Sequence, residues 1–567
     1  MIRWSSFICP LAAVCALSGE PRPLQAQSDS ASLSSEVVAR VSELVNRYFR
    51  ESGVPGLAAA VVNDRGIVWS TTLGRVDTAP SSGPINGETI FSIQSMTKSF
   101  TALAVLLAVQ DGLLDLDAPI ARYLPGFRVN SRFEAHPESL ITLRHLLSHR
   151  SGVVHEAPFG NTTDLAYGFE RHVESLSRTW LQFPVGYCYS YSNGGVDLAG
   201  YVLQVLSGRP FARYLRERAL NPLRMTRSSA DFDAVERAGN RARGHWTSPD
   251  PLPVRFSMIP AGGLYSSLED MARYLMFHLN RGQVGGRRVL RGDLMSEFHS
   301  IQFPLPGQRM GYALGLFRNS LITPYGVWHA GGGHGFFSYV AAYPDLNLGV
   351  VVLTNSQARN LSADSFRFID EAIFRRYGLR LDSAPPRAAM TALDGADPRV
   401  RHRIGRYGSG SPEIRSTADG ALQIVMGRDT LPLAFFEHQG RTVALFGEGG
   451  VVSFLPDLGD QPGAMMVYDV RYGNSNSNYF FFNDSPDDAP GPDRPEWQQY
   501  VGEYESVYHG RRLFTASVHR RNGYLYWREQ KLREHSRGVF FRNDGWEVNF
   551  NEDPPRMGHY RIRRLGS

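Results

Sequence analysis

FSIQSMTKSF, residues 91–100, runs directly into TALAVLLAVQ, residues 101–110, and the predicted fold is organised around this sequence. The second part consists almost entirely of Ala, Leu and Val, and Gly112 shortly after it supplies a helix stop. A helix that is apolar on all sides is normally buried in a protein core. The sequence therefore predicts a core helix that begins close to Ser95 and Lys98.

Ser95 and Lys98 have a spacing that places both side chains on one helical face. At this spacing a lysine amine can take the proton of a serine hydroxyl and make the serine a nucleophile. The unpaired amides and the positive dipole end of the helix would stabilise an oxyanion formed there. The alternative is a chance Ser-x-x-Lys pair, which is common on helices.

Lysine is rare in this chain, since Lys98 and Lys531 are the only two among 60 Lys and Arg residues. Arginine stays protonated in proteins, whereas a desolvated lysine can lose its proton near neutral pH and act as a base. A lysine at position 98 of so arginine-rich a chain indicates a role that arginine cannot fill.

The length and charge of the chain limit its organisation and its partners. The 567 residues are too many for one hydrophobic core, so about two to four domains are expected. The formal net charge is +5 at pH 7, but the arginines are scattered and do not alternate with aromatic residues in a stripe. A nucleic-acid partner is therefore not expected.

The N-terminal segment has the features of a signal peptide, which we assign to residues 1–26. Arg3 precedes an apolar segment, residues 7–17. We therefore expect an exported protein, either periplasmic or secreted. Cys15 suggests lipidation as an alternative, but the residues ahead of it do not fit such a site. The mature chain keeps only Cys188, so no internal disulfide is expected, and no later segment offers about 18 consecutive apolar residues for a membrane span.

An amphipathic helix and a strand hairpin are predicted on each side of a long helical region. These elements are residues 34–50 (helix), 57–62 and 67–72 (strands), 336–343 and 349–354 (strands) and 365–377 (helix). Residues 112–303 between them show mostly helical and loop patterns. The chain is therefore expected to leave a sheet, build a helical lobe and return to the sheet, within one domain at residues 27–381.

The C-terminal third changes to short alternating runs with Gly, Asn and Asp turns, which predicts an all-β region. A weak internal repeat pairs IGRY, residues 404–407, with VGEY, residues 501–504. Two related β units, or two halves of one barrel such as a lipocalin-like barrel, would produce this repeat. The predicted boundaries are a linker at 382–400, a first β unit at 401–482, a second linker at 483–495 and a second β unit at 496–567.

Two further motifs fit a hydrolytic site with Ser95. PVGYCYSYSN, residues 184–193, ends in Tyr191-Ser192-Asn193, in which the tyrosine can shuttle a proton and the asparagine can bind a substrate carbonyl or the lysine. The alternative is a surface turn that contains a tyrosine. WHAGGGHG, residues 328–335, has glycines that would let a substrate backbone approach a strand edge, with the Gly332 amide as an oxyanion donor.

These three motifs in this order resemble the serine β-lactamase and penicillin-binding-protein superfamily, in particular the branch of class C β-lactamases, β-lactamase-like esterases, DD-peptidases and D-aminopeptidases. Other segments that look like this family are LRHLLSHRSG (143–152), NPLRM (221–225) and AGGLYSSLEDMA (261–272). The resemblance implies an α+β fold with a five-stranded antiparallel sheet, terminal helices that flank it and an inserted helical lobe. It also implies a site between sheet and lobe, with no cofactor.

The resemblance also implies a role for each matching residue. These roles are the acylated nucleophile for Ser95, its base partner for Lys98, the proton shuttle for Tyr191, the amide clamp for Asn193 and the oxyanion hole for the amides of Ser95 and Gly332. The third motif departs from the family, because His329-Ala330-Gly331 stands where β-lactamases usually have Lys-Thr-Gly. Histidine has an unperturbed pKa of about 6.5 and is mostly neutral at pH 7, so His329 and Gly331 favour substrates without a carboxylate to hold.

Three functions follow as hypotheses. The first is an acyl-enzyme hydrolase for small esters, amides or D-amino-acid peptides, whose partner is a small-molecule or peptide substrate. The second is a DD-peptidase or β-lactamase, and the third is a non-catalytic binding protein, which the intact motif residues argue against. His145 and His149 have the spacing of a metal pair, but no glutamate follows in place, so no metal is expected. The sequence carries no signal for an oligomeric state.

Overall fold

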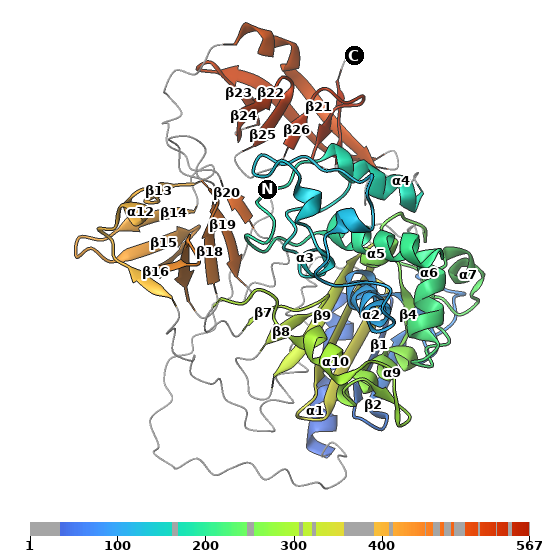
Figure 1. The fold of residues 1–567 in the computed structure, drawn as a ribbon. Coiled ribbons are helices and arrows are strands. Elements are labelled where there is room, and N and C mark those ends of the chain that lie inside the picture. The colour runs from blue at the N-terminus through green and yellow to red at the C-terminus, as the bar shows by residue number, and fades with distance from the viewer. Residues whose placement is uncertain are drawn as a thin grey trace, which may run out of the picture.

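The computed structural model describes most of the chain after the N-terminal segment (Figure 1). The described residues are 35–160, 168–245, 254–305, 310–319, 325–356, 390–407, 412–447, 450–456, 465–469, 478–480, 494–508, 511–528, 530–542, 547–558 and 560–565. The predicted signal peptide at 1–26 and the predicted helix at 365–377 lie outside these residues, as does most of the predicted linker at 483–495. No helix among the described residues is long and apolar enough to span a membrane.

The largest domain is built on an antiparallel sheet in the order β2-β1-β11-β10-β9-β8-β7. Its strands are β1 Gly56–Val62, β2 Ile67–Gly74, β7 Met310–Tyr312, β8 Phe317–Asn319, β9 Gly326–Gly333, β10 Phe336–Tyr343 and β11 Leu348–Thr354. The sheet thus has seven strands, and the expectation of five was too low. The extra strands β7 and β8 have 3 residues each, which is too short for an alternating pattern to identify them.

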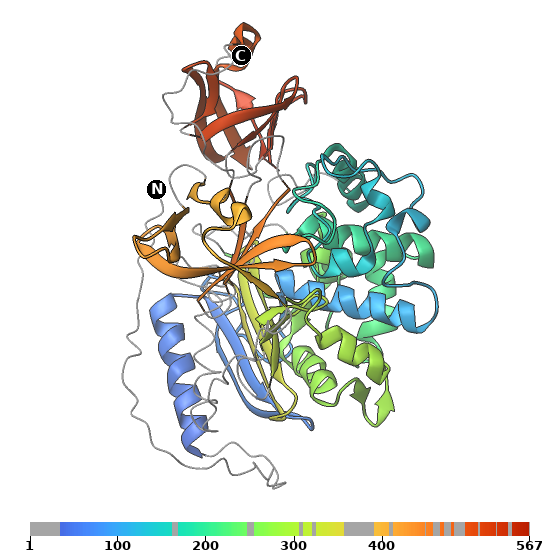
Figure 2. The same cartoon turned by 60° about the vertical axis from the view of Figure 1, so that its left-hand side comes forward.

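Both faces of the central strands are buried. Helix α1 (Ser35–Ser52) packs with Leu57, Ala59 and Val61 on one face, through Val37, Val41 and Val45. The alternate residues of β1 belong to the main core on the other face, where the helical lobe lies (Figure 2). This alternation is the expected result of side chains that point to opposite faces of a strand. It confirms that a sheet lies between the N-terminal helix and the lobe.

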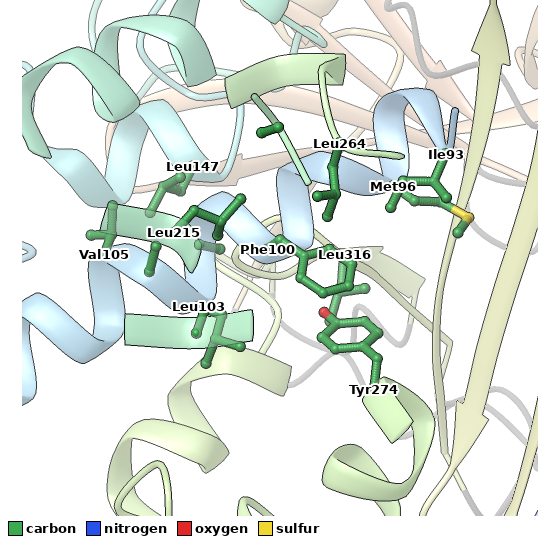
Figure 3. Packing of buried hydrophobic residues seen from close by; sticks show 14 of the residues in the cluster. Ile93, Met96, Phe100, Leu103, Val105, Leu147, Leu215, Leu264, Tyr274 and Leu316 are labelled. Atoms are coloured by element: carbon green, nitrogen blue, oxygen red, sulfur yellow. The ribbon is translucent and has the colours of Figure 1, made fainter. Parts of the chain in front are cut away.

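Helix α2 (Thr97–Gln110) runs through the middle of the lobe, and its residues from Thr97 to Ala108 are buried. Phe100 stacks on Tyr274 with ring centroids 4.0 Å apart, and Leu264 and Leu316 lie near the Phe100 ring (Figure 3). The prediction of a core helix is therefore confirmed. The other helices of the domain are α3 Leu143–Leu147, α4 Phe169–Glu174, α5 Asn193–Ser207, α6 Phe211–Leu215, α7 Phe232–Arg237, α8 Ile259–Gly262, α9 Leu268–Leu279 and α10 Gly292–His299.

Short elements complete this domain. They are the strand pairs β3 Ile90–Ser92 with β4 Tyr265–Ser267 and β5 Gln283–Val284 with β6 Arg287–Arg288, the 3-10 helices η1 Gln94–Met96, η2 Ile120–Arg122, η3 Pro137–Ser139 and η4 Ser175–Arg178, and the π-helix η5 Arg216–Leu220. The pair β3–β4 is important for the site, because β3 leads directly into η1 and α2.

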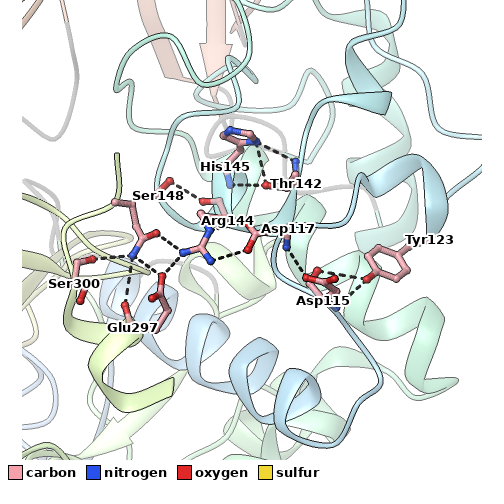
Figure 4. Close-up of polar contacts among 10 residues, drawn as sticks. Asp115, Asp117, Tyr123, Thr142, Arg144, His145, Ser148, Glu297 and Ser300 are labelled. Carbon is pink, nitrogen blue, oxygen red and sulfur yellow. Dashed lines mark hydrogen bonds and ion pairs between the residues drawn. The ribbon is translucent and has the colours of Figure 1, made fainter. Parts of the chain in front are cut away.

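Arg144 ties the start of α3 to neighbouring parts of the lobe (Figure 4). Its Nε and Nη2 atoms donate to the two carboxylate oxygens of Asp117 at 2.6 and 2.8 Å. Its Nη1 atom donates to Gln302 at 2.7 Å and to Glu297 on α10. A paired donation of this kind fixes direction as well as distance. The Arg144 contacts therefore fix α3, which lies just before residues that contact the site.

The C-terminal region contains two further sheets, each around its own hydrophobic cluster. The strands of the first are β12 Thr391–Leu393, β13 Gly405–Arg406, β14 Glu413–Ser416, β15 Leu422–Met426, β16 Asp429–His438, β17 Arg441–Phe446, β18 Gly450–Phe454, β19 Met465–Asp469 and β20 Asn478–Phe480. Those of the second are β21 Gly502–Tyr508, β22 Arg511–Arg521, β23 Tyr524–Trp527, β24 Gln530–Ser536, β25 Val539–Arg542, β26 Glu547–Asn549, β27 Arg556–Met557, β28 Tyr560–Arg561 and β29 Arg563–Arg564. Strand β28 also lies against β21, so the second sheet forms a nearly closed barrel. Separate cores favour two related units over two halves of one barrel.

The weak sequence repeat corresponds to the same local structure in both units. Tyr407 and Tyr504 are buried, and each hydroxyl donates at 2.9 Å to the carbonyl four residues earlier, in Arg403 and Tyr500. Each tyrosine follows a short helix, α12 (Pro398–Arg401) or η8 (Pro495–Tyr500). Strand β12, which pairs with β16, and most of helix α12 fall within 382–400, so part of this predicted linker is joined to the first β unit.

Candidate active site

Ser95 and Lys98 meet where β3 turns into α2. Ser95 lies in η1, one turn before the regular helix, and Lys98 is in the first turn of α2 with no exposed surface. The Lys98 Nζ atom donates to Ser95 Oγ at 3.1 Å and to the Ala261 carbonyl at 2.7 Å. A nucleophile within hydrogen-bond reach of an oriented basic group is the arrangement that activates a serine.

Burial lowers the pKa of Lys98 to about 7, while the negative charges of Asp197 and Glu156 act in the opposite direction. An ammonium group loses its hydration when it is buried, so the neutral amine becomes the easier form to hold. Close to neutral pH a large fraction of Lys98 can therefore accept the Ser95 proton. A base works best when its pKa lies close to the working pH.

A buried acid, Asp197 on α5, holds the lysine in place through the backbone. One carboxylate oxygen of Asp197 accepts from the Ala261 amide at 2.9 Å, and the carbonyl of the same residue accepts from Lys98. The other oxygen lies 3.0 Å from His172 Nε2, and both side chains are fully buried. His172 Nδ1 lies 2.6 Å from the Phe159 carbonyl, which can only accept, so this nitrogen carries a proton. The sequence analysis did not predict the pair of Asp197 and His172. The signal that could have indicated it is Asp197, a single acidic residue in the mostly apolar pattern of α5.

Tyr191 lies beside the lysine, with its ring centroid 4.7 Å from Lys98 Nζ. Burial raises the pKa of the Tyr191 hydroxyl above its usual range, although a hydrogen bond with Ser95 opposes this rise. The hydroxyl is thus protonated when the Lys98 amine is neutral. This order of pKa values suits Lys98 as the proton acceptor and Tyr191 as a group that passes a proton on.

His149 supports the backbone on which Tyr191 is carried. Thr142 caps the start of α3 together with the ring of His145, so His145 has a structural use. Beyond the helix, His149 Nδ1 accepts from the Ser192 amide at 3.1 Å, and its ring lies 4.3 Å from that of Tyr191. The two histidines are therefore used in helix capping and in packing against the site.

Asn193 is the first residue of α5, after Ser192, whose hydroxyl caps the helix by accepting from the Gly195 amide at 2.7 Å. Among the described residues the buried side-chain oxygen of Asn193 has no hydrogen-bond partner. Asn193 also lines the cavity beside Ser95. A buried acceptor without a partner is costly unless a ligand supplies a donor, so this oxygen can receive a substrate N–H.

His329 on β9 is held as a neutral ring. Its Nδ1 atom lies 2.6 Å from the Ala330 carbonyl and must carry the proton, because a carbonyl only accepts. Its Nε2 atom is then the acceptor for the Tyr312 hydroxyl at 2.9 Å. Burial, with repulsion from Lys98, lowers the pKa of His329 to about 3. The expectation of a neutral histidine agrees with this geometry, while its partner Tyr312 on β7 was not predicted.

The glycines of the third motif have two different roles. A Cβ atom on Gly331 would lie 2.1 Å from the Ile93 carbonyl, so Gly331 allows β9 to pack tightly on the turn that carries Ser95. Gly331 is not among the residues that line the cavity, whereas Gly332 is exposed to it. Gly332 is thus placed where its backbone can meet a ligand.

The cavity beside Ser95 has a volume of about 300 Å³ and brings most of the predicted residues together. Its walls include the predicted Ser95, Tyr191, Asn193, His329 and Gly332, and the unpredicted Gln94, His155, Glu156, Phe256, Met258, Ala261, Phe317, Trp328 and Phe337. The wall is therefore largely aromatic and aliphatic, with one acidic side chain. Within the described part of the chain, no group of three or more His, Cys, Asp or Glu side chains could hold a metal ion.

A family model described as beta-lactamase matches residues 39–373, which is more than half of the chain. The chain belongs to the β-lactamase family. This family protein is 29% identical over 269 residues to beta-lactamase-like protein 2 of Dictyostelium discoideum, a match that covers 46% of this chain and 48% of that one. It is 24% identical over 340 residues to protein flp of Staphylococcus aureus strain N315, covering 57% and 64% of the two chains. The chain thus matches less than two thirds of the length of these relatives.

Solved structures show the same fold. The crystal structure of SurE with D-Leu covers 79% of this β-lactamase-family chain and 100% of its own chain, with a TM-score of 0.54 and 22% identity. The octameric penicillin-binding protein homologue from Pyrococcus abyssi covers 79% and 98%, with a TM-score of 0.52 and 21% identity. At these identities the likeness concerns the fold.

Proposed function

We propose that this β-lactamase-family protein is a serine hydrolase that acts through an acyl-enzyme on small esters, amides or D-amino-acid peptides. The observation that carries the proposal is the environment of Lys98. Its amine is fully buried, lies 3.1 Å from Ser95 Oγ and has a pKa of about 7. A lysine in this state is able to remove a hydroxyl proton at neutral pH.

In the proposed reaction the neutral Lys98 amine takes the Ser95 proton while Oγ forms a bond to the substrate carbonyl carbon. The resulting oxyanion faces the amides of Ser95 and Gly332, which act as hydrogen-bond donors. The bond to the leaving group then breaks, and the leaving group takes a proton from the Tyr191 hydroxyl, which is restored by the Lys98 ammonium. Water, activated by the same amine, hydrolyses the ester at Ser95 and releases the acid.

The substrate class follows from the charges around the cavity. His329 is neutral and locked by Tyr312 and the Ala330 carbonyl, so it supplies no positive charge for a substrate carboxylate. The aromatic wall favours an apolar acyl group, and the open oxygen of Asn193 suits an amide N–H. The crystal structure of SurE was described with D-Leu. We therefore include D-amino-acid derivatives among the substrates to be tested.

A DD-peptidase or β-lactamase activity is the second candidate. The open oxygen of Asn193 favours it, because such substrates contain an amide next to the bond that is cleaved. The missing positive charge at position 329 weighs against it. A non-catalytic binding protein is less well supported, since Ser95, Lys98 and Tyr191 are held in a complete arrangement. We also propose that the protein is exported, on the basis of its N-terminal sequence.

Covalent labelling tests the proposal directly. Wild-type protein, Ser95→Ala and the matched control Ser99→Ala are incubated with a fluorophosphonate or a fluorescent penicillin, and the adduct is mapped by mass spectrometry. Ser99 lies on the same helix, and its hydroxyl donates to the Met96 carbonyl at 2.8 Å. We expect an adduct at Ser95 in the wild type and in Ser99→Ala, and none in Ser95→Ala. Full ester hydrolysis by Ser95→Ala would contradict the assignment.

A further inference from the structure

The segment from residue 183 to 190 leads to Tyr191 without forming a helix or a strand. Its last part is held on the catalytic domain by the Ser190 amide, which donates to the His149 carbonyl at 2.9 Å. Tyr191 therefore lies between this irregular segment and the start of α5, which Ser192 caps. The contacts of the segment, which include the Gly186 amide donating to the Arg150 carbonyl at 2.8 Å, act together with that cap to set the direction in which Tyr191 enters the site.

A second set of contacts to this segment comes from the first β unit, whose strands β18 and β19 face the lobe (Figure 1). Arg441, at the start of β17, donates from Nη1 to the carbonyls of Tyr187 at 3.0 Å and of Gly186 at 3.3 Å. Its guanidinium also lies over the Tyr187 ring, 4.6 Å from the centroid. The Tyr187 hydroxyl donates to the Phe454 carbonyl at 2.7 Å. The β unit thus holds two successive residues that lie a few positions before Tyr191.

Apolar packing alone does not fix this contact. A small cluster with Cys188 and Met466 crosses it, but a cavity of about 290 Å³ lies along the same boundary. The cavity walls include Tyr189 from the catalytic domain and Arg441 and Val451 from the β unit. Because the boundary is partly open, the directional contacts of Arg441 carry more of the positioning than in a close-packed core.

We propose that the first β unit is a working part of the active site and that Arg441 is a positioning residue for Tyr191. Arg441 holds the backbone of Gly186 and Tyr187, and so sets the distance of Tyr191 from Lys98 and Ser95. Arginine suits this role because its planar guanidinium can stack flat on a ring while its edge donates to carbonyls, a geometry that the compact ammonium group of lysine does not offer. The inference rests on the acyl-enzyme function proposed above and assigns a role in it to the β unit.

The test measures the rate at which a p-nitroanilide, an amide whose leaving group needs a proton, acylates Ser95 across pH, in full-length wild type, Arg441→Ala, Arg441→Lys and Arg415→Ala. Arg415 is an exposed arginine on β14 of the same unit and serves as the charge-matched control. We expect Arg441→Ala to lower the rate by about 10- to 100-fold, the order of effect of a displacement of about 1 Å. The midpoint of its pH profile should move up, because water then reaches Lys98. Arg441→Lys should recover little, and Arg415→Ala should match wild type.

A wild-type rate and midpoint in Arg441→Ala would overturn the inference. If Arg441→Ala does not fold, as judged by thermal unfolding, Tyr187→Phe decides instead, because it keeps the ring and removes the hydroxyl that donates to Phe454. We expect a smaller loss with a shift in the same direction, and an unchanged Tyr187→Phe would overturn the inference. Absence of an adduct at Ser95 in the wild type would contradict the proposed function itself, so the two failures are distinguishable.

Discussion

The two lysines of this chain are both buried next to a tyrosine ring, but they differ in their position relative to the candidate active site. Lys98 is fully buried with its amine 4.7 Å from the Tyr191 ring centroid, and Lys531 on β24 is 5% exposed with its amine 3.4 Å from the Tyr524 ring centroid. Lys98 also meets the Ser95 hydroxyl at 3.1 Å, next to a cavity of about 300 Å³. The Ser95 hydroxyl within reach of the Lys98 amine, beside a cavity that can hold a substrate, is what gives Lys98 a proton to accept.

Exchange of each lysine for arginine tests this difference most strongly. In Lys98→Arg we expect acylation to fall by about 10²- to 10⁴-fold, because arginine cannot accept the serine proton. Lys531→Arg should retain the wild-type rate, since Lys531 lies in the second β unit and is not among the residues that line the cavity. Stopped-flow acylation of both variants checks this. Substantial activity in Lys98→Arg would show that a positive charge is sufficient there.

The two tyrosines provide the next comparison. Tyr191→Phe keeps the ring beside Lys98 and removes the hydroxyl, so we expect turnover of an amide to fall by about 10²-fold through loss of proton transfer to the leaving group. Tyr524→Phe is the matched control in the second β unit and should have no effect. Turnover of an amide and of an activated ester is measured in each variant. Equal losses on both substrates in Tyr191→Phe would argue against a role at the leaving group.

Asp197→Asn tests how the charge of Asp197 contributes to the pKa of Lys98, which is about 7. The charge of Asp197 raises the pKa of Lys98, so its removal should lower that pKa and move the midpoint of the acylation profile to lower pH. The rate on the upper plateau should fall by less than about 10-fold, because the side-chain oxygen of asparagine can still accept from the Ala261 amide, although more weakly than a carboxylate. A midpoint that moves to higher pH would show that the charge of Asp197 does not raise the pKa of Lys98.

His329→Lys should have the smallest effect on simple esters and the clearest effect on specificity. A lysine at this position would add a positive charge beside the cavity, so a cephalosporin with its carboxylate should be acylated faster, with little change for p-nitrophenyl butyrate. The ratio of kcat/KM for the two substrates measures the effect. Equal losses on both substrates would place His329 in the catalytic machinery.

The features that could be predicted from the sequence are those that depend on the spacing of residues close together in the chain. Ser95 and Lys98 stand at the start of a helix that is apolar all round, so both their approach and the burial of the lysine could be predicted. The residues Tyr191, Asn193, His329 and Gly332 were found through motifs of the same local kind, and the structure brings them to one cavity.

The residues that support the site could not be predicted in this way. Tyr312 comes from a strand of 3 residues, and Arg441 reaches the segment before Tyr191 from a different domain. The pair of Asp197 with His172 joins two helices, and neither side chain forms a motif with its neighbours in sequence. Such contacts depend on how distant elements pack, and no periodicity records them. The strands of the sheet were undercounted because β7 and β8, with 3 residues each, are too short to show an alternating pattern.

The pH dependence of Ser95 acylation in the wild-type protein tests the central claim most directly. A neutral amine is the active form of the base, so the rate should be low below the pKa of Lys98 and high above it. We predict a single rise with a midpoint at about pH 7, the value that burial gives to Lys98. A rate that is constant between about pH 5 and 9, or that rises only near the ordinary lysine pKa of about 10.4, would contradict the role of Lys98 as the base.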